Sequence, residues 1–205
     1  MALWIDKETE AVEQPVFLKI LEIGHGGGLI KVDARVPGCL HTLYEGTPLA
    51  TCTTAGQYHF MKSAVLSTVH TGSQTATKIH VEWPHPFKAG DFVGLSIAGW
   101  DAASCTTILV AAETYLVTIV TEFDAPKHTV VYETAAAQAT APKHRPYGLL
   151  RHSVRVREDD GTTCYNVYAP IVFQGSALSS NYLFGYPIDI KNRLTHIRFV
   201  DKGQQ

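Results

Sequence analysis

Short segments in which apolar and polar residues alternate recur along most of this chain. In the segment 78–83, the apolar side chains of Ile79, Val81 and Trp83 alternate with polar ones, which is the period of a β-strand with one buried face and one face in water. The Pro-His-Pro that follows ends the pattern, because proline cannot donate a hydrogen bond to a neighbouring strand. The same alternation near the C-terminus predicts a strand over residues 196–200.

Runs of β-branched and apolar residues between turn signals predict further strands at 92–97, 106–110, 115–121 and 129–132. The Asp160-Gly161 step predicts a tight turn, so residues 153–157 and 162–172 are expected to pair as a hairpin. Along the whole chain we count about nine or ten strand candidates, at the spacing typical of a sandwich or barrel. We therefore predict a mainly-β protein with a sandwich- or barrel-like body and little helix.

Helical signals are few. The alanine-rich segment 133–140 favours helix by propensity, but it is short and Pro142 ends it. A loop with one helical turn fits that segment equally well. Residues 189–194 are a second candidate for a short helical turn. Long amphipathic segments do not alternate with the strands, which argues against a doubly wound α/β fold.

Two stretches divide the chain. Residues 24–28 read Gly-His-Gly-Gly-Gly, a sequence typical of a hinge or a tight turn. The Ala/Pro-rich stretch 135–146 separates the apolar middle of the chain from its last third. We predict an N-terminal arm with its glycine hinge at 1–28 and a β body at 29–205. The body is either split into two lobes near 135–146 or carries a long surface loop there.

The N-terminal arm carries large apolar side chains, among them Trp4, Ile5 and Phe17, with acidic residues between them. Such an arm in front of a glycine hinge is suited to docking on a partner subunit. Burial of Trp4 or Ile5 in a partner would contribute about 1.5–3 kcal/mol each, which offsets only part of the cost of ordering a flexible arm. The alternative is that residues 16–23 form the first strand of the body.

Composition excludes several classes of function. The chain has 205 residues, 45% of them hydrophobic, and a formal charge of −2, so it lacks the basic surface of a nucleic-acid-binding protein and the polarity of a disordered chain. The N-terminus lacks the basic and apolar regions of a signal peptide, and no apolar run reaches the ~20 residues of a spanning helix. Four cysteines are scattered without a C-x-x-C pair, so we expect reduced thiols and no zinc site.

The sequence His-Gly-Gly-Gly at 25–28 matches a string that lines the oxyanion hole of some α/β-hydrolases. Those enzymes also need a G-x-S-x-G elbow, and the nearest segment, 94–99, has its second glycine one position late. A small esterase built on Gly26, Gly27, Gly28 and Ser96 is therefore the least supported alternative. Ten histidines include no H-E-x-x-H pair and are expected to be solvated. We predict no catalytic, cofactor-binding or metal-binding residue.

Tyr182, Phe184 and Tyr186 lie two residues apart, so on a strand the three rings would share one face. A buried row would be core, and an exposed row would be a subunit interface or a surface for stacking on sugar rings. Core or interface is favoured over sugar binding, and no acidic pair lies nearby to suggest glycosidase chemistry. A carbohydrate-binding or host-recognition module is the second functional hypothesis.

Five motifs follow one another along the chain: Glu-Gly-Thr-Pro-Leu at 45–49, Phe-Lys-Ala-Gly-Asp-Phe-Val at 87–93, Pro-Tyr-Gly-Leu-Leu with the next four residues at 146–154, Pro-Ile-Val-Phe-Gln-Gly at 170–175, and Leu-Thr-His-Ile-Arg-Phe at 194–199. Their order resembles that of head-fibre and capsid-decoration proteins of tailed bacteriophages. They are strand and turn sequences that carry no catalytic residues. The Ala/Pro stretch and the His-Gly-Gly-Gly string depart from that pattern.

The resemblance implies a non-enzymatic virion protein that is made in the host cytoplasm and binds the capsid surface as a decoration, head-fibre or other auxiliary subunit. Its partners would be the major capsid protein and other virion proteins, with no nucleic acid, membrane or cofactor. The resemblance also implies a homotrimer, because such proteins occupy three-fold positions of the shell. Candidate partner-contact residues are Trp4, Ile5, Phe17, Tyr182, Phe184 and Tyr186.

Overall fold

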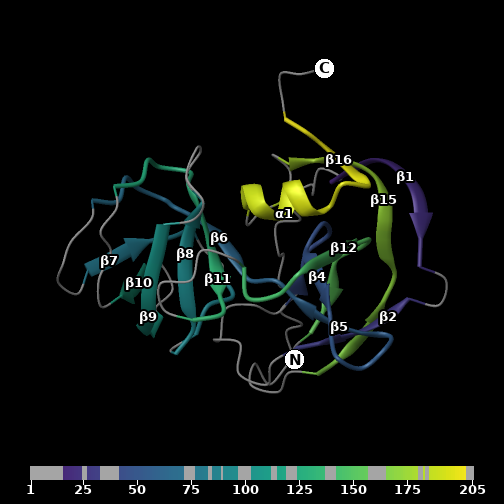
Figure 1. The fold of residues 1–205 in the computed structure, drawn as a ribbon, viewed down its shortest axis with the longest axis horizontal. Coiled ribbons are helices and arrows are strands. Elements are labelled where there is room, and N and C mark those ends of the chain that lie inside the picture. The colour runs from purple at the N-terminus through teal and green to yellow at the C-terminus, as the bar shows by residue number, and fades with distance from the viewer. Residues whose placement is uncertain are drawn as a thin grey trace, which may run out of the picture.

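The computed structural model of the chain describes residues 16–24, 27–32, 42–71, 77–82, 85–88, 90–96, 103–111, 115–118, 124–136, 142–156, 165–179, 182 and 185–201. In these residues the chain forms sixteen strands and one six-residue helix, arranged around two separate sheets (Figure 1). The prediction of a mainly-β body with little helix is confirmed. Within the described part of the chain, no helix is long and apolar enough to cross a membrane.

The larger sheet has eight strands and curls around its own core (Figure 1). Its strands are β1 (Phe17–Ile23), β2 (Gly28–Lys31), β4 (Pro48–Thr51), β5 (Gln57–Phe60), β12 (Pro146–Leu150), β14 (Val167–Ala169), β15 (Ile171–Leu178) and β16 (Ile197–Val200). The strand order is β1-β15-β12-β4-β5-β2-β14, and β16 pairs in parallel with the second half of β15. A two-stranded pair, β3 (Thr42–Leu43) with β13 (Val154–Arg155), accompanies it.

The core of the larger sheet lies between its curled inner face and the helix α1 (Ile188–Arg193). Leu49, Leu149 and Ile171 are fully or almost fully buried on β4, β12 and β15. Ile190 and Leu194, from the helix and its end, belong to the same apolar cluster. The expected helical turn near 189–194 is thus confirmed, and its stability comes from packing, because an isolated helix of this length does not persist in water.

The smaller sheet closes on itself. Its strands are β6 (Ser63–Val65), β7 (Thr77–His80), β8 (Phe92–Ser96), β9 (Ala103–Ala111), β10 (Tyr115–Thr118) and β11 (Val130–Thr134), in the order β6-β11-β8-β9-β10-β7. An antiparallel bridge joins Leu66 to Val81, next to backbone bonds of 3.0 Å from Ser67 to His80 and 2.8 Å from Glu82 to Val65. These contacts connect β6 to β7, so the six strands form a small antiparallel barrel.

The alternation expected in residues 78–83 determines the inside of this barrel. Ile79 and Val81 are buried, whereas Lys78 and His80 are exposed. Leu66 and Phe87 are also fully buried in the same cluster. The barrel therefore has an apolar core of its own, separate from that of the larger sheet.

The hairpin expected around Asp160-Gly161 is described only at its base. Strand β13 pairs with β3, and β14 pairs with β2. One backbone bond of 3.0 Å, from Tyr165 to Val156, joins the two segments, and residues 157–164 lie outside the described residues. Pro170 separates β14 from β15, since it cannot donate to a strand ladder. The two halves of the expected second strand each pair with a strand far away in the sequence: β14 with β2, and β15 with β1.

The N-terminal boundary also differs from the expectation. Strand β1 pairs with β15, from Phe17 opposite Ala177 to Ile23 opposite Val172, so residues 17–23 are a strand of the body. Gly24 and Gly27 are held close together, because the Gly27 N–H donates to the Gly24 carbonyl at 3.2 Å, and Gly27 has a φ of 68°. The Gly24 N–H also donates to the Ile171 carbonyl at 2.9 Å, while His25 and Gly26 lie outside the described residues. Trp4 and Ile5, with the rest of residues 1–15, lie outside the described residues.

The two sheets do not divide the chain at a single point. The barrel is made of residues 63–134, while the segments before and after it share the larger sheet. The chain crosses between the sheets at residues 61–62 and again between β11 and β12. The Ala/Pro stretch 135–146 lies at the second crossing. In the alanine-rich segment 133–140, Glu133 and Thr134 end strand β11 and are not helical, and residues 137–141 lie outside the described residues.

Candidate functional site

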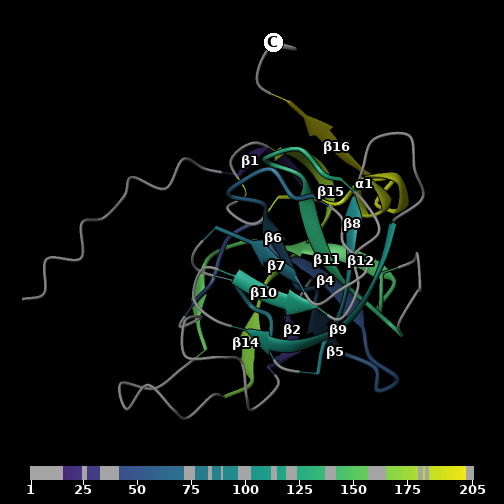
Figure 2. The same cartoon turned by 90° about the vertical axis from the view of Figure 1, so that its left-hand side faces the viewer.

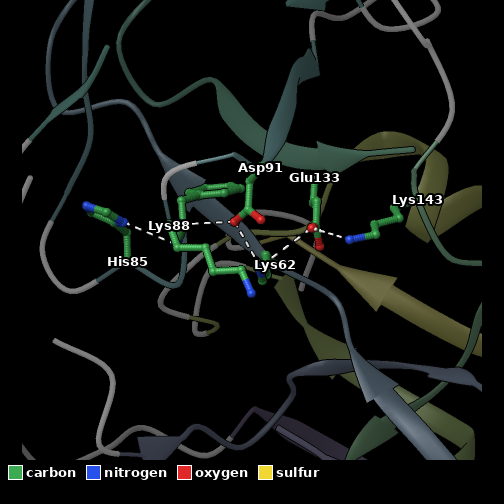
Figure 3. Close-up of polar contacts among 7 residues, drawn as sticks. Lys62, His85, Lys88, Asp91, Glu133 and Lys143 are labelled. Carbon is green, nitrogen blue, oxygen red and sulfur yellow. Dashed lines mark hydrogen bonds and ion pairs between the residues drawn. The ribbon is translucent and has the colours of Figure 1, made fainter. Parts of the chain in front are cut away.

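A cluster of four charged side chains lies where the chain crosses between the two sheets (Figure 3). This junction cluster consists of Lys62, Asp91, Glu133 and Lys143. The side chains of Lys62, Asp91 and Glu133 are only 3%, 4% and 5% exposed, while Lys143 is 40% exposed. Burial of three charged groups this deep is rare unless they compensate one another.

Strand pairing brings the three buried groups together. Lys62 immediately precedes β6, Asp91 immediately precedes β8, and Glu133 lies on β11, which pairs with β6 on one side and β8 on the other. The Glu133 N–H donates to the Lys62 carbonyl at 3.1 Å, which continues the ladder past the end of β6. The three side chains therefore come from three adjacent strands at one end of the barrel.

The contacts within the cluster are short. The Lys62 Nζ lies 2.8 Å from the Asp91 Oδ2 and 3.5 Å from the Glu133 Oε1. The Lys143 Nζ lies 2.8 Å from the same Glu133 oxygen, and the Lys88 backbone N–H donates to the Asp91 Oδ2 at 3.0 Å. Two positive and two negative charges balance, and Lys62 is held between the two carboxylates.

The space beside the cluster is small. A hollow bordered by Lys62, Glu133 and Lys143 has room for about one water molecule. Pockets that bind cofactors or drug-sized molecules are much larger, at about 300–1,000 Å³. Any chemistry at this place therefore involves the cluster's own groups and at most a water.

The structure places two of the three predicted aromatic residues in the core. Tyr182 and Tyr186 are 4% and 5% exposed, and their rings stack with centroids 4.6 Å apart. The Tyr186 hydroxyl donates to the Gly46 carbonyl at 2.8 Å. Burial raises the pKa of both phenols.

The three aromatic residues do not share a strand. Residues 185–187 are not in a strand, because Gly185 turns the chain with a φ of 67°, and Phe184 lies outside the described residues. Tyr182 and Tyr186 are thus not available on the surface of this chain, whereas Phe17 is partly buried on β1 against the same core.

The described residues of the esterase hypothesis lie at different sheets, and Gly26 lies outside the described residues. The N–H of Gly27 donates to the Gly24 carbonyl at 3.2 Å, so this group is engaged in the turn and does not point toward a substrate. A Cβ at Gly28 would lie 2.2 Å from the Tyr58 ring. These glycines belong to the larger sheet, whereas Ser96 ends β8 of the barrel. The glycines are needed for close packing.

The histidines are more varied than expected. His70 and His85 are buried, and the rings of His59 and His144 stack with centroids 4.7 Å apart. Burial lowers the pKa of His70, with the charge of Asp124 opposing that shift and His80 adding to it. In the described part of the chain, no three His, Cys, Asp or Glu side chains are placed to hold a metal ion.

A second aromatic group was not foreseen from the sequence. Tyr58, Tyr147 and Phe173 come from β5, β12 and β15, and centroid distances of 5.9 Å and 5.0 Å connect them through Tyr147. Tyr147 is 49% exposed. A Cβ at Gly24 would lie 2.7 Å from the Phe173 ring, so the glycine-rich turn packs directly beside this aromatic trio.

Sequence reasoning also missed the junction cluster. Asp91 was recognised only as part of a turn, and Lys62 and Glu133 were not singled out. The available signal was a charged residue at the end of an apolar segment, as in Phe-Met-Lys-Ser-Ala-Val at 60–65 and Val-Val-Tyr-Glu-Thr at 130–134. No protein-family model, curated protein or solved structure matches this chain.

Proposed function

We propose that this protein is a non-enzymatic structural protein of a virion, which binds the capsid surface of a tailed bacteriophage as a head-decoration, head-fibre or other auxiliary subunit. The proposal combines the order of sequence motifs with one structural observation. Leu18 and Leu21 are 51% and 58% exposed on β1, an edge strand of the larger sheet. Large apolar side chains that remain exposed near one another favour contact with another protein.

The backbone of β1 directs these leucines outward. Register shifts relative to β15 fall between Phe17 and Lys19 and between Ile20 and Glu22, so Leu18 and Leu21 are the extra residues of two irregularities. Bulges of this kind re-aim side chains and discourage pairing with another strand. A partner would therefore receive the two leucines in an apolar groove. On this proposal the partner is the major capsid protein, another virion protein or a neighbouring copy in a trimer.

Two measurements test this proposal. Mass spectrometry of purified virions of the phage that encodes the chain should detect it, and recombinant protein should co-sediment with capsids that lack it. The double variant Leu18→Ser/Leu21→Ser should bind at least about tenfold more weakly, because loss of half-exposed leucine contacts removes about 1.4 kcal/mol or more. Val69→Ser is the matched control, since Val69 is 68% exposed but lies beside the barrel. Absence of the chain from virions, together with no co-sedimentation, would refute the proposal.

The aromatic trio supports a second candidate, a carbohydrate-binding or host-recognition module. Exposed aromatic rings on a rigid sheet offer apolar faces on which sugar rings stack, and Tyr147 is the most exposed ring of the three that contact one another. On this hypothesis Tyr58, Tyr147 and Phe173 take the role expected for the buried Tyr182 and Tyr186. Glycan-array binding that disappears in Tyr147→Ala but persists in Tyr168→Ala, another exposed tyrosine, would favour this candidate over the first.

A further inference from the structure

Three adjacent strands place an amine, a carboxyl group and a second carboxyl group in contact inside the protein. We propose that the Nζ of Lys62 and the side-chain carboxyl of Asp91 condense into an intramolecular isopeptide bond, with Glu133 as the group that carries the protons. This modification site is independent of the proposed function in the virion.

The reacting groups are held against each other before any reaction. The Lys62 Nζ is 2.8 Å from the Asp91 Oδ2. Both residues adjoin strands whose positions are fixed by pairing with β11. Amide formation between free amines and carboxylates is slow in water, but fixed proximity corresponds to a very high effective concentration, up to about 10⁵–10⁸ M for well-oriented groups. The strand pairing thus supplies the orientation that the reaction needs.

The reacting pair is shielded from water. The reaction begins when one proton moves from the Lys62 amine to the Asp91 carboxylate across their 2.8 Å contact. With Lys62 and Asp91 only 3% and 4% exposed, bulk water is largely excluded from this pair.

The covalent step balances without an added reactant. The lone pair of the Lys62 nitrogen attacks the carboxyl carbon of Asp91, a C–N bond forms, and the carbonyl electron pair moves onto the Oδ2. The Lys88 backbone N–H, 3.0 Å from that oxygen, stabilises the negative charge that develops there. This donor is part of the turn that precedes β8, so it is in place before the charge appears.

Glu133 completes the proton transfers. Its Oε1 lies 3.5 Å from the Lys62 Nζ, so it accepts a proton from the attacking nitrogen and returns it to the hydroxyl that leaves from Asp91. The C–O bond breaks, and water is released toward the hollow that borders Lys62 and Glu133. The sum is one ammonium and one carboxylate converted to one amide and one water, and Glu133 ends in its starting state.

The cross-link would connect positions that are 29 residues apart and clamp the strands on both sides of β11. It would close a loop at the end of the barrel that faces the larger sheet. A covalent bond that closes such a loop restricts the unfolded chain, as a disulfide does.

Intact and peptide-level mass spectrometry of the purified full-length protein tests this proposal. We expect a mass lower than that of the sequence by one water molecule, and a branched peptide that joins the fragments containing Lys62 and Asp91. Succinimide formation at Asp160-Gly161 would also release one water, so Asp160→Glu is the control that should keep the loss. A wild-type chain with its full mass and unbranched peptides after prolonged incubation would overturn the proposal and leave an ionic cluster.

Variants separate the chemistry from folding. Lys62→Arg keeps the positive charge, and it should abolish both the water loss and the branched peptide. Glu133→Gln should slow cross-linking, while Lys143→Ala, which removes a half-exposed partner of Glu133, should still cross-link. The cross-linked wild type should melt roughly 10 °C above Lys62→Arg. Water loss and the branched peptide persisting in Asp91→Ala would refute the assignment, whatever the melting temperatures.

Discussion

The larger sheet takes its strands from both ends of the chain, whereas the barrel is built from the uninterrupted segment 63–134. Strand β1 pairs with β15 across most of the sequence, so the larger sheet is complete only when the termini have met. In the sequence, the barrel is inserted between β5 and β12. Each region buries its own apolar cluster.

The contrast extends to how the regions are joined. Inside each sheet the buried contacts are mostly apolar, but where the chain crosses between them three charged side chains are buried together (Figure 3). A view from the side of the barrel shows β6, β7 and β11 in front of the strands of the larger sheet (Figure 2). This ionic cluster fixes the arrangement of β6, β8 and β11 at that end of the barrel, because displacement of one buried member would leave a buried charge unpaired. Lys143, on the segment that leads to β12, reaches the cluster from outside the barrel.

The largest expected effect comes from breaking that junction. Lys62→Ala leaves the carboxylates of Asp91 and Glu133 buried without the charge between them, and removal of one partner from a buried ionic group costs about 3–5 kcal/mol. Urea unfolding should show this loss when the reference is wild-type protein of full mass, in which Lys62 and Asp91 are not cross-linked. Lys143→Ala removes a partner that is 40% exposed and should cost at most about 1 kcal/mol. Equal losses of unfolding free energy in the two variants would contradict the idea that burial makes the contacts of Lys62 more stabilising than those of Lys143.

Core truncations compare the two regions directly. Leu149→Ala in the larger sheet and Leu66→Ala in the barrel each remove a fully buried side chain and should cost about 2–5 kcal/mol. Hydrogen exchange followed by peptide mass spectrometry should show faster exchange in β4, β12 and β15 for the first variant and in β6 and β11 for the second. Faster exchange throughout both regions in either variant would mean that they unfold as one unit.

A glycine substitution tests whether residues 24–28 are a tight turn or a hinge. In Gly27→Ala the new Cβ would lie 2.7 Å from the Ala169 carbonyl oxygen at a φ of 68°, so strain and a backbone clash should together cost about 2–4 kcal/mol. At Gly56 the φ is 73° but nothing lies within 4 Å. Gly56→Ala should therefore cost only about 1 kcal/mol. Thermal unfolding measures both, and an equally mild effect at Gly27 would favour the hinge.

The smallest expected effect is a pH dependence near the barrel. Burial lowers the pKa of His70 below its ordinary value of 6.5, against the opposing charge of Asp124 and with a contribution from His80. As the pH falls below about 6.5, the unfolded chain binds the proton before the folded chain does, so the free energy of unfolding decreases until the folded pKa is passed. Urea unfolding of wild type and His70→Gln between pH 7 and 5 should show a smaller decrease in the variant. If the free energy of unfolding decreases equally with pH in wild type and His70→Gln, groups other than His70 cause the acid sensitivity.

The sequence by itself determined the class of the fold and about half of its strands. Alternation in residues 78–81 correctly separated the buried Ile79 and Val81 from the exposed Lys78 and His80, because the two-residue period of a strand is a local property. The same period correctly predicted a strand near 196–200. The short helix near 189–194 was also visible. What these signals report is the shape of a segment and the polarity of its two faces, and neither depends on where the segment pairs.

Only the tertiary structure decided which strands pair with each other. Nothing local to residues 153–172 indicated that β13 would pair with β3 and β14 with β2, since backbone groups of any two strands can form a ladder. Likewise, Lys62, Asp91 and Glu133 are ordinary charged residues until pairing of β11 with β6 and β8 brings them together at one end of the barrel. Burial is a property of the assembled fold, and it turned three residues with no motif into a buried ionic cluster.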